Sequence, residues 1–425
     1  MKASIDTLCV QGGWQPGNGG PRQPPIVQST TFRYSSSAAM GALFDLEAEG
    51  YFYTRLANPT NDAVAQKICD MEGGVAAVLT SSGQAANFFA IFNIAQCGDH
   101  VVASSALYGG TSNLFTVTMK KMGIEVTLLD PESSGPEIDA AFRPNTKCVF
   151  GETLSNPSLA VLDIEKWARA AHARGVPLIV DNTFATPVNC RPFQWGADIV
   201  THSTTKYMDG HGSAVGGAIV DSGAFDWLAH KEKFPGLCRP DDSYHGIVYA
   251  ERFGRKGYIT KCVAQLMRDL GATPAPMNSY LLNLGLESLH VRVPRHCANA
   301  LAVARFLEQS PDVSWVNCAM LPSDPAYGRA RKYMPSGTCG VLSFGLKGGR
   351  DRAIRFMDAL RFVAIQTHVA DARSCILHPA SHTHRQLADE QLAAAGVPPD
   401  LVRLSCGIED AADIIADLRQ ALQRG

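Results

Sequence analysis

Four segments of the sequence carry side chains that could do chemistry, and each of them follows a short apolar run. They are a small-residue turn with Ser82, Gly83 and Gln84, the aromatic residue Tyr108 before two glycines, the carboxylate Asp181, and Lys206 in a loop with Ser203 and Thr205. In open α/β sheets, ligands bind beyond the carboxyl ends of the strands. We therefore expect the four segments to lie close together at one edge of a sheet.

Each segment by itself also has an ordinary structural explanation. Serine and glycine before a helix are common capping residues, although the free N–H groups of such a turn can also hold a phosphate. Asp181 could simply cap the next turn, but a carboxylate at the end of a buried strand needs a cation or hydrogen-bond donors. A lone lysine is usually a solvated surface group, and an aromatic residue before glycines is more often a packing residue.

In combination and in this chain order, the four segments have the residue types that pyridoxal 5′-phosphate (PLP) requires. A lysine forms a Schiff base with the cofactor, and an acid keeps the pyridine nitrogen protonated so that the ring accepts electrons. An aromatic side chain covers the ring, and a turn of free N–H groups takes the phosphate. The combination therefore favours a PLP site built from Tyr108, Asp181, Lys206 and the turn 80–84.

Two other motifs indicate different chemistry. Ser203 and Lys206 fit the S-x-x-K pattern of a serine nucleophile, but the S-D-N and K-T-G motifs that accompany it in penicillin-binding proteins are absent from the sequence. His378, His382 and His384 could bind a metal, but no H-E-x-x-H motif or cysteine pair supports them. We therefore predict no metal site, and the serine hydrolase remains an alternative.

Composition and charge narrow the class of protein. The chain has 425 residues, with 38 lysines plus arginines and 40 aspartates plus glutamates, so its net charge of −2 provides no bulk positive field for nucleic acid. No apolar run approaches the roughly 20 residues of a membrane span, and the N-terminus has no apolar signal segment, so we expect a cytoplasmic protein. The 12 cysteines occur singly without a CxxC pair, which favours reduced and mostly buried thiols.

The elements that must position the candidate residues follow from an alternation of apolar runs and helical stretches. We expect seven strands and two helices in this part, with the strands at 75–79, 100–103, 125–129, 148–151, 177–180, 198–201 and 218–220 and the helices at 84–96 and 163–174. The alternation is typical of βαβ units. The sequence therefore predicts an α/β fold with a mostly parallel central sheet and helices on both of its faces.

The sequence predicts three parts of the chain. Residues 1–60 are rich in glycine and proline and form an extended arm, residues 61–258 form the cofactor domain, and residues 259–425 form a smaller C-terminal α+β domain. A boundary helix is expected near 250–273. The elements expected after it are helices at 278–309, 351–362 and 410–422 and strands at 313–317, 340–346 and 401–406.

Seven ordered blocks of the sequence resemble the cysteine/methionine-metabolism family of PLP-dependent enzymes of fold type I. The blocks are Tyr53-Thr54-Arg55 with Asn58-Pro59-Thr60, Ser81 to Ala86, Leu107 to Thr111, Asn156-Pro157, Val180 to Thr183, Ser203 to Tyr207, and Leu401 to Ser405. The resemblance covers nearly the whole chain and implies the transferase fold of that family. Within the family, the sequence is most similar to the O-acetylhomoserine sulfhydrylases, especially over 105–114 and 371–384.

The resemblance implies a role for each residue of the site. Lys206 would carry the cofactor and move protons, Asp181 would pair with the pyridinium nitrogen, and Tyr108 would stack on the ring and assist proton transfer. The phosphate would be held by Ser82, Gly83, Gln84, Ser203 and Thr205, together with Tyr53 and Arg55 of a neighbouring subunit. Arg403 would bind the α-carboxylate of the substrate, and Asn156 would contact the cofactor or the substrate.

The resemblance also implies an activity and an assembly. The reaction would be γ-replacement on O-acetyl-L-homoserine with sulfide or a small thiol, giving homocysteine or methionine and acetate, in a homotetramer with shared active sites. The alternative is a methionine or cystathionine γ-lyase that releases 2-oxobutyrate; against it, Gly110 stands where methionine γ-lyases have a cysteine. His368-Val369-Ala370 replaces a Ser-Leu-Gly of the family, which leaves the role of His368 open.

Overall fold

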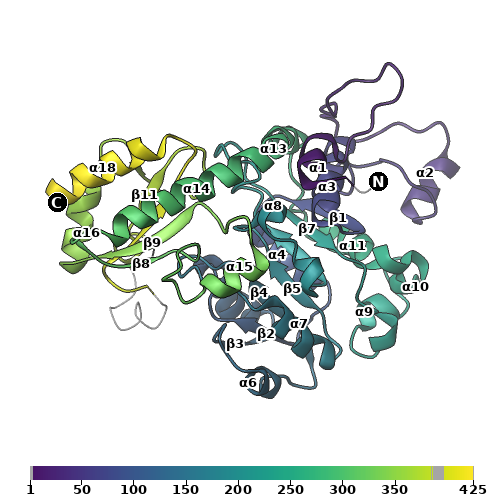
Figure 1. Cartoon of the computed structure of the whole chain (residues 1–425). Coiled ribbons are helices and arrows are strands. Elements are labelled where there is room, and N and C mark those ends of the chain that lie inside the picture. The colour runs from purple at the N-terminus through teal and green to yellow at the C-terminus, as the bar shows by residue number, and fades with distance from the viewer. Residues whose placement is uncertain (1–2, 384, 386–396, 425) are drawn as a thin grey trace.

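A seven-stranded β-sheet forms the centre of the chain. The computed structural model describes residues 3–383, 385 and 397–424. The sheet has the strand order β1-β7-β6-β5-β4-β2-β3 (Figure 1). Its strands are β1 (Ala76–Thr80), β2 (His100–Ser104), β3 (Glu125–Leu129), β4 (Thr146–Glu152), β5 (Leu178–Asp181), β6 (Ile199–His202) and β7 (Gly217–Asp221). Each of them matches one of the strands predicted from the apolar runs.

The strand directions confirm a mostly parallel sheet. The neighbouring strands β3, β2, β4, β5 and β6 run parallel, whereas β7 runs antiparallel to both β6 and β1. A parallel neighbour needs a crossover that returns the chain to the opposite edge of the sheet, usually through a helix. Residues 203–216, between β6 and β7, form no such helix and return at the edge where β6 ends. This connection contains Lys206, so the lysine loop is anchored in the sheet at both ends.

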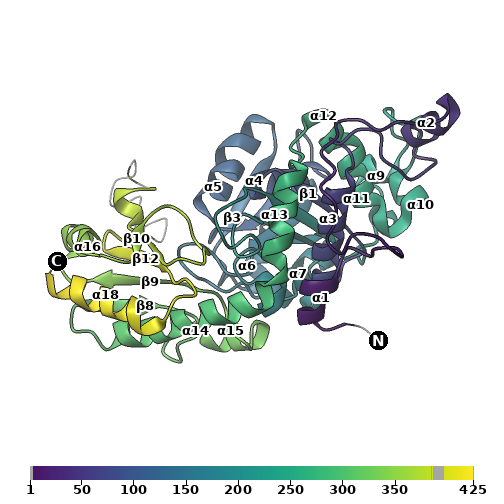
Figure 2. The same ribbon diagram turned by 90° about the horizontal axis from the view of Figure 1, so that it is seen from above.

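Helices cover both faces of the sheet, as predicted. Asn87 of α4 (Gly83–Phe92) donates a hydrogen bond to Asp181 at the end of β5, at 3.1 Å. Glu72 of α3 (Pro59–Glu72) accepts one from the next residue, Asn182, at 2.9 Å. Successive residues of a strand point to opposite faces. Helices α3 and α4 therefore lie on opposite sides of the sheet, as the view from above also shows (Figure 2).

The two helices predicted for this part are α4 and α7 (Ile164–Ala173). Helix α7 begins at Asp163, whose carboxylate accepts the N–H of Lys166 at 3.2 Å, and it ends before Gly175, which has a φ of +62°. The shorter helices around the sheet are α5 (Gly109–Asn113), α6 (Gly135–Ala140), α8 (Thr186–Asn189) and α9 (Pro235–Cys238).

A second sheet forms the C-terminal α+β unit. Its strand order is β10-β11-β12-β9-β8, with β8 (Val313–Asn317), β9 (Val341–Leu346), β10 (Ala364–Ile365), β11 (Cys375–Leu377) and β12 (Leu401–Ser405). The helices of this unit are α14 (Leu289–Glu308), α15 (Tyr327–Tyr333), α16 (Gly349–Asp358) and α18 (Ala411–Arg424). The strands β10 and β11 were not predicted, because two or three residues carry too little pattern to be recognised.

Two helices that the sequence predicts as continuous are interrupted in the structure. The stretch 278–309 is divided at Ser288 into α13 (Pro276–Glu287) and α14. The stretch 250–273 consists of α10 (Tyr249–Phe253), α11 (Gly257–Lys261), a π-helical turn at Cys262–Met267 and α12 (Arg268–Leu270). Gly254, with a φ of +52°, lies between the first two, and a positive φ does not continue a right-handed helix.

Helix α14 belongs to both hydrophobic cores. Leu289, Val293 and Cys297 pack in the core of the larger sheet, and Ala300 and Leu307 pack in the core of the smaller one. Residues 259–297, which were assigned to the C-terminal domain, contribute mainly to the first core. The packing therefore favours a division within α14, some forty residues after the expected boundary, and the limits of the domains stay a prediction.

The N-terminal arm is only partly extended. It contains α1 (Ile5–Gln11) and α2 (Ser37–Phe44), and no other helix longer than a turn before Pro59. Cys9 of α1 is fully buried in the core of the larger sheet. Helix α2, in contrast, lies at the periphery of the molecule in both views (Figures 1 and 2).

All 12 cysteines are free thiols, and ten of them are buried. This agrees with the prediction of reduced, mostly buried cysteines. Within the described parts of the chain, none of the helices is long and apolar enough to cross a membrane.

Candidate active site

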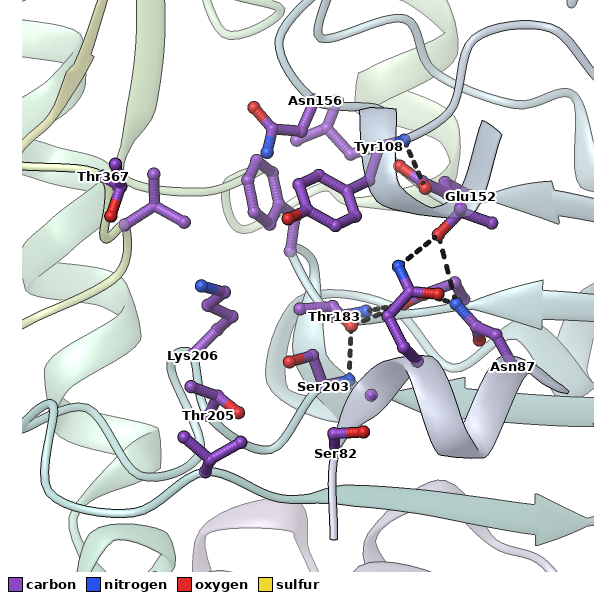
Figure 3. Close-up of a pocket in the computed structure, with 18 of the residues that line it drawn as sticks. Ser82, Asn87, Tyr108, Glu152, Asn156, Thr183, Ser203, Thr205, Lys206 and Thr367 are labelled. Carbon is purple, nitrogen blue, oxygen red and sulfur yellow. Dashed lines mark hydrogen bonds between the residues drawn. The ribbon is translucent and has the colours of Figure 1, made fainter. Parts of the chain in front are cut away.

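A pocket of about 210 Å³ opens at the carboxyl ends of β4, β5 and β6 (Figure 3). Ten of the twelve predicted site residues line it: Ser82, Gly83, Gln84, Tyr108, Asn156, Asp181, Ser203, Thr205, Lys206 and Arg403. The segments that carry them are up to 321 residues apart, from 82 to 403. The rule that ligands bind beyond the carboxyl ends of strands therefore located this pocket correctly.

Tyr53 and Arg55 are the two predicted residues that do not line the pocket of their own chain. They lie in the arm, where the Arg55 guanidinium carbon is 5.1 Å from the centre of the Tyr53 ring and Tyr53 pairs with Thr31 in an isolated bridge. Their predicted contact is with the site of a neighbouring subunit, and it stays a prediction.

The small-residue turn forms one wall of the pocket. The Ser82 hydroxyl caps α4 by accepting the N–H of Ala85 at 3.1 Å. A Cβ at Gly83 would lie 2.5 Å from the Ser203 Cβ, so only glycine lets the turn and the lysine loop approach so closely. The first N–H groups of a helix have no partner inside the helix. This wall therefore offers N–H and hydroxyl donors to an anion such as a phosphate.

The carboxylate of Asp181 is held in place at the end of β5. Asn87 Nδ2 donates to one oxygen at 3.1 Å, and Thr183 donates to the other oxygen with its N–H, at 3.0 Å, and with its hydroxyl. The same Thr183 hydroxyl accepts the N–H of Ser203 at 2.8 Å, which ties the carboxylate to the lysine loop. Asp181 thus presents an oriented acceptor to a cationic N–H group in the pocket.

Lys206 points its amine into the pocket from the loop after β6 (Figure 3). Burial lowers the pKa of this amine to about 8, and the positive charge of Arg403 lowers it further in the same direction. With a pKa of about 8, roughly a tenth of the amine is neutral at pH 7 and half at pH 8, far more than for an ordinary lysine. A neutral amine is the form that attacks a carbonyl carbon or takes up a proton.

The lowered pKa of Lys206 leads to a first prediction, made for the protein without cofactor. The neutral amine is the reactive form, and with a pKa of about 8 half of Lys206 is neutral at pH 8, against less than about 1% of an ordinary lysine. The rate at which trinitrobenzenesulfonate labels Lys206 should therefore rise with pH, with a midpoint near 8. The labelling is measured by mass spectrometry of the peptide that contains Lys206 and is divided by the labelling of the exposed Lys231. A midpoint near 10 would contradict the prediction.

Arg403 reaches the pocket from β12 of the second sheet. Its Nη1 donates to Asn156 Oδ1 at 3.2 Å and its Nη2 to the Thr367 carbonyl at 3.1 Å, while Nε has no partner among the described residues. The side chain is only 7% exposed, and burial lowers the pKa of its guanidinium to about 10. A buried guanidinium that faces only neutral oxygens is a binding site for an anion, and a carboxylate matches its fork.

Tyr108 lies at the mouth of the pocket and is 50% exposed. A Cβ at Gly110 would lie 2.5 Å from an edge carbon of the Tyr108 ring and 2.8 Å from Gln84 Nε2. The glycine therefore leaves room for the ring where a side chain, such as the cysteine of methionine γ-lyases, would have to displace it.

Glu152 is a residue of the pocket that the sequence analysis missed. It is buried at the end of β4, beside Asp181 in the sheet register, and accepts the N–H of Tyr108 at 2.7 Å. Burial, and next the charge of Asp181, raise the pKa of the Glu152 carboxyl well above its usual value, which favours the neutral acid. The same rule that selected Asp181 could have found it, because Glu152 directly follows the apolar run 148–151.

A neutral Glu152 predicts a small effect for Glu152→Gln. Glutamine keeps the oxygen that accepts the Tyr108 N–H and carries no charge, so the turnover number should stay within about threefold of wild type. Leucine leaves that N–H without a partner, so Glu152→Leu should lower the turnover number about tenfold. The infrared carbonyl band of a protonated carboxyl should disappear in Glu152→Gln. If glutamine costs as much as leucine, the carboxylate charge matters and this assignment is wrong.

The other motifs do not form sites of their own. The ring of His378 is bonded through Nδ1 to the Ser381 hydroxyl and through Nε2 to the Pro399 carbonyl, both at 2.8 Å. His384 lies outside the described residues, and among the described ones no group of His, Cys, Asp and Glu could hold a metal. The side chain of His368 does not line the pocket, and its Nε2 is buried without a partner among the described residues.

Comparison with known proteins decides the family. Residues 6–423 match the family of Cys/Met metabolism PLP-dependent enzymes. The chain belongs to this family. The relationship proposed from the seven sequence blocks is thereby confirmed.

Two curated members of the family illustrate how similar the chain is to them. It is 43% identical to a homocysteine synthase of Schizosaccharomyces pombe over 424 residues, which cover 99% of this chain and 98% of that protein. It is 44% identical to an O-acetyl-L-homoserine sulfhydrylase of Corynebacterium glutamicum over 400 residues, which cover 93% and 91%.

Solved structures of the family confirm the fold. The chain matches a putative O-acetylhomoserine (thiol)-lyase of Campylobacter jejuni with a TM-score of 0.95 and 37% identity, over 99% of this chain and 100% of that one. That structure contains N′-pyridoxyl-lysine-5′-monophosphate. A second match is metB of Corynebacterium glutamicum, with a TM-score of 0.84 and 33% identity, over 99% and 98%.

The pocket fits the PLP of this family on observations of its own. Two polar atoms that line it are buried without a partner among the described residues, Gln84 Oε1 and Arg403 Nε. The pocket also brings together an oriented carboxylate, a lysine amine with a lowered pKa and an N–H-rich turn. These are the groups that a pyridinium, an aldehyde and a phosphate require. The cofactor predicted from the residues alone thus agrees with the family.

Proposed function

We propose that the protein catalyses γ-replacement on O-acetyl-L-homoserine with sulfide or a small thiol, giving homocysteine or methionine and acetate. The observation that supports the proposal is a single pocket that is lined by both Lys206, whose pKa is lowered, and Arg403, which is buried without an acid partner. The names of the relatives, homocysteine synthase and O-acetyl-L-homoserine sulfhydrylase, support the choice of substrate.

The cofactor would be held by the residues that line the turn and the lysine loop. When bound, PLP supplies an electron sink that stabilises negative charge on the carbon atoms of the substrate. Asp181 would accept the pyridinium N–H, Tyr108 would cover the ring, and Lys206 would bond to the aldehyde carbon. The phosphate would accept hydrogen bonds from Ser82, Gly83, Gln84, Ser203 and Thr205.

Lys206 would move the protons of the reaction. When the substrate amine takes its place on the aldehyde carbon, the Lys206 amine, with a pKa lowered to about 8, would be free to remove a proton from the α-carbon. It would give this proton up to the conjugated system that PLP supplies before it removes a second proton from the β-carbon. Acetate leaves the γ-carbon with its bonding electrons, and hydrosulfide forms the new carbon–sulfur bond there. Lys206 then returns protons to the β-carbon and the α-carbon, so that homocysteine and acetate are the balanced products.

Arg403 and Asn156 would orient the amino acid. The free Nε of Arg403 and its two bonded nitrogens form a fork that matches a carboxylate. Binding the α-carboxylate there fixes which bond of the α-carbon faces Lys206. Asn156, which accepts from Nη1 at 3.2 Å, would keep the guanidinium plane in place.

The proposal includes a neighbouring subunit. Tyr53 and Arg55 lie on the arm outside the pocket of their own chain, and they would complete the phosphate site of the next subunit in a homotetramer. We also propose a cytoplasmic location, since a chain with 12 free thiols suits a reducing compartment.

A substrate panel tests the function. The purified holoenzyme is incubated with O-acetyl- or O-succinyl-L-homoserine, each with sulfide or methanethiol, and the products are identified by mass spectrometry. We expect homocysteine or methionine from the acetyl ester. Rapid release of 2-oxobutyrate from methionine or cystathionine alone would show a γ-lyase instead, and covalent labelling of Ser203 by a fluorophosphonate would show the serine hydrolase.

A further inference from the structure

Tyr207, which directly follows Lys206, bonds the lysine loop to the second sheet. Its side chain is fully buried, and its hydroxyl accepts the N–H of Gly340 at 2.7 Å. Gly340 directly precedes β9, the strand that pairs with β12 and thus with the strand of Arg403. A single hydrogen bond therefore connects the neighbour of the lysine to the sheet that carries the arginine.

Gly340 is the point at which three segments meet. A Cβ at this position would lie 2.8 Å from the His296 Cβ, 3.0 Å from the Cys406 carbonyl oxygen and 3.1 Å from the Tyr207 hydroxyl. The Gly340 carbonyl in turn accepts the N–H of Cys406 at 2.8 Å. Cys406 is the residue after β12, three positions beyond Arg403. The absence of a side chain at Gly340 keeps the phenol of Tyr207 close to the end of the arginine strand.

Helix α14 holds the same residues from the other side. Arg292 and His296 are one helical turn apart, so they point in the same direction. Arg292 Nη1 donates to the Tyr207 carbonyl at 2.8 Å and Nη2 to the Met208 carbonyl at 3.4 Å. The His296 ring meets the Tyr207 ring edge-on, at 5.1 Å between centres, and its Nδ1 is bonded to the Cys406 carbonyl at 2.7 Å.

The burial of Arg292 indicates that this arrangement is more than ordinary packing. The guanidinium is 5% exposed, and its bonds go to backbone carbonyls and the Ser288 hydroxyl, with no ion pair among the described residues. The loop winds around it so tightly that a Cβ at Gly210 would lie 2.0 Å from Nη1. A buried cation bonded only to neutral acceptors is costly, and here it fixes the backbone of the two residues after Lys206.

We propose that Tyr207, Arg292 and His296 form a clasp that sets the position of Lys206 relative to Arg403. The inference rests on the proposed roles of Lys206 and Arg403. None of the three clasp residues lines the pocket, so they are positioning residues and not catalytic ones. The clasp would hold the amine and the carboxylate-binding fork at the separation that one amino acid spans.

The variant Tyr207→Phe tests the clasp, with Tyr258→Phe as its matched control. Tyr258 is equally buried, and its hydroxyl donates to the Ala90 carbonyl at 2.6 Å, away from the pocket. Both variants lose one buried hydroxyl and should unfold at similar temperatures. Only Tyr207→Phe should raise KM for O-acetylhomoserine about tenfold, because Lys206 and Arg403 would no longer be aligned for this substrate. The KM for sulfide should change less.

Two further measurements separate positioning from general packing. In an Arg403→Leu background, Tyr207→Phe should raise KM no further, because the fork that it positions is gone. Amide hydrogen exchange of Gly340, followed without substrate, should be about tenfold faster in Tyr207→Phe and unchanged in Tyr258→Phe, since only the first variant removes the acceptor of this N–H. Equal KM values in the two tyrosine variants, or additive effects with Arg403→Leu, would overturn the clasp.

A second variant keeps the test decisive if Tyr207→Phe does not fold. Gly340→Ala pushes the phenol and the Cys406 carbonyl apart and should give the same rise in KM; an unchanged KM would overturn the clasp. The exchange measurement needs no catalysis. If Gly340 exchanges faster in Tyr207→Phe but the wild type does not use O-acetylhomoserine, only the proposed function is overturned. If the wild type uses O-acetylhomoserine but the variants have the KM and the Gly340 exchange of wild type, only the clasp is overturned.

Discussion

A Lys206→Ala variant is expected to lose turnover by about 10⁴-fold or more, because it removes the group that transfers both protons. Lys206 is the only amine among the residues that line the pocket. Alanine has no amine that could bond to the cofactor, so the variant should also lack the visible absorption band of the wild type. The rate is measured as acetate release from O-acetylhomoserine in the presence of sulfide.

Lys261 provides a matched control for this variant. Its amine is also buried, with a pKa likewise lowered to about 8 by burial, but it bonds to the carbonyl of Asn93, outside the active-site pocket. Lys261→Met should keep the turnover number of wild type at temperatures where it is folded. Borohydride treatment of wild type should bleach the visible band and leave the cofactor on the peptide that contains Lys206. Turnover by Lys206→Ala, or a label on another lysine, would contradict the mechanism.

An Arg403→Leu variant should lower kcat/KM for O-acetylhomoserine by about 10² to 10³-fold, mostly through KM, because a buried charged partner of the carboxylate is lost. Arg403→Lys keeps the charge but not the two-pronged geometry, so its loss should be intermediate. The variants are compared with wild type under saturating sulfide. The expected effect is large because Arg403 is only 7% exposed, so that solvent screens its charge little.

The carboxamide of the same substrate provides the control for Arg403. It has no carboxylate, so wild type and Arg403→Leu should process it at similar low rates if the guanidinium acts on that group alone. The two proteins should also unfold at temperatures that differ much less than their kcat/KM values. An equal loss on the ester substrate and on its carboxamide would show that Arg403 supports the fold of the site and not the substrate.

Much of the pocket was predictable because its residues follow buried strands. A parallel strand covered on both faces must be apolar along its whole length, so the polar residue that ends it is easily seen, as for Asp181 after 177–180. The loop with Lys206 follows β6 for the same reason. Nine of the ten predicted residues line one pocket because the carboxyl ends of the strands lie along one edge; the tenth, Arg403, comes from β12 of the second sheet.

The parts that were missed depend on contacts between distant segments. The raised pKa of Glu152 arises first from its burial and next from its neighbour Asp181 in the sheet, and strand order cannot be read from apolar runs. The break at Ser288 between α13 and α14 does not fall at a proline or glycine, because Gly285 and Pro294 both lie inside the helices on either side of it. The role of the arm residues Tyr53 and Arg55 was predicted from the resemblance to the family, and it stays a prediction because they do not line the pocket of their own chain.

The position of α14 in both hydrophobic cores has a consequence for cooperativity. The first half of α14 packs in one core and the second half in the other, so melting of one unit leaves half of the helix without packing and removes part of the support of the other unit. The two units should then unfold in a single calorimetric transition, and a fragment cut at residue 258 should not fold alone. An exchange of one unit for that of a relative would place the junction in the middle of α14, so the two halves of this helix would have to come from different proteins.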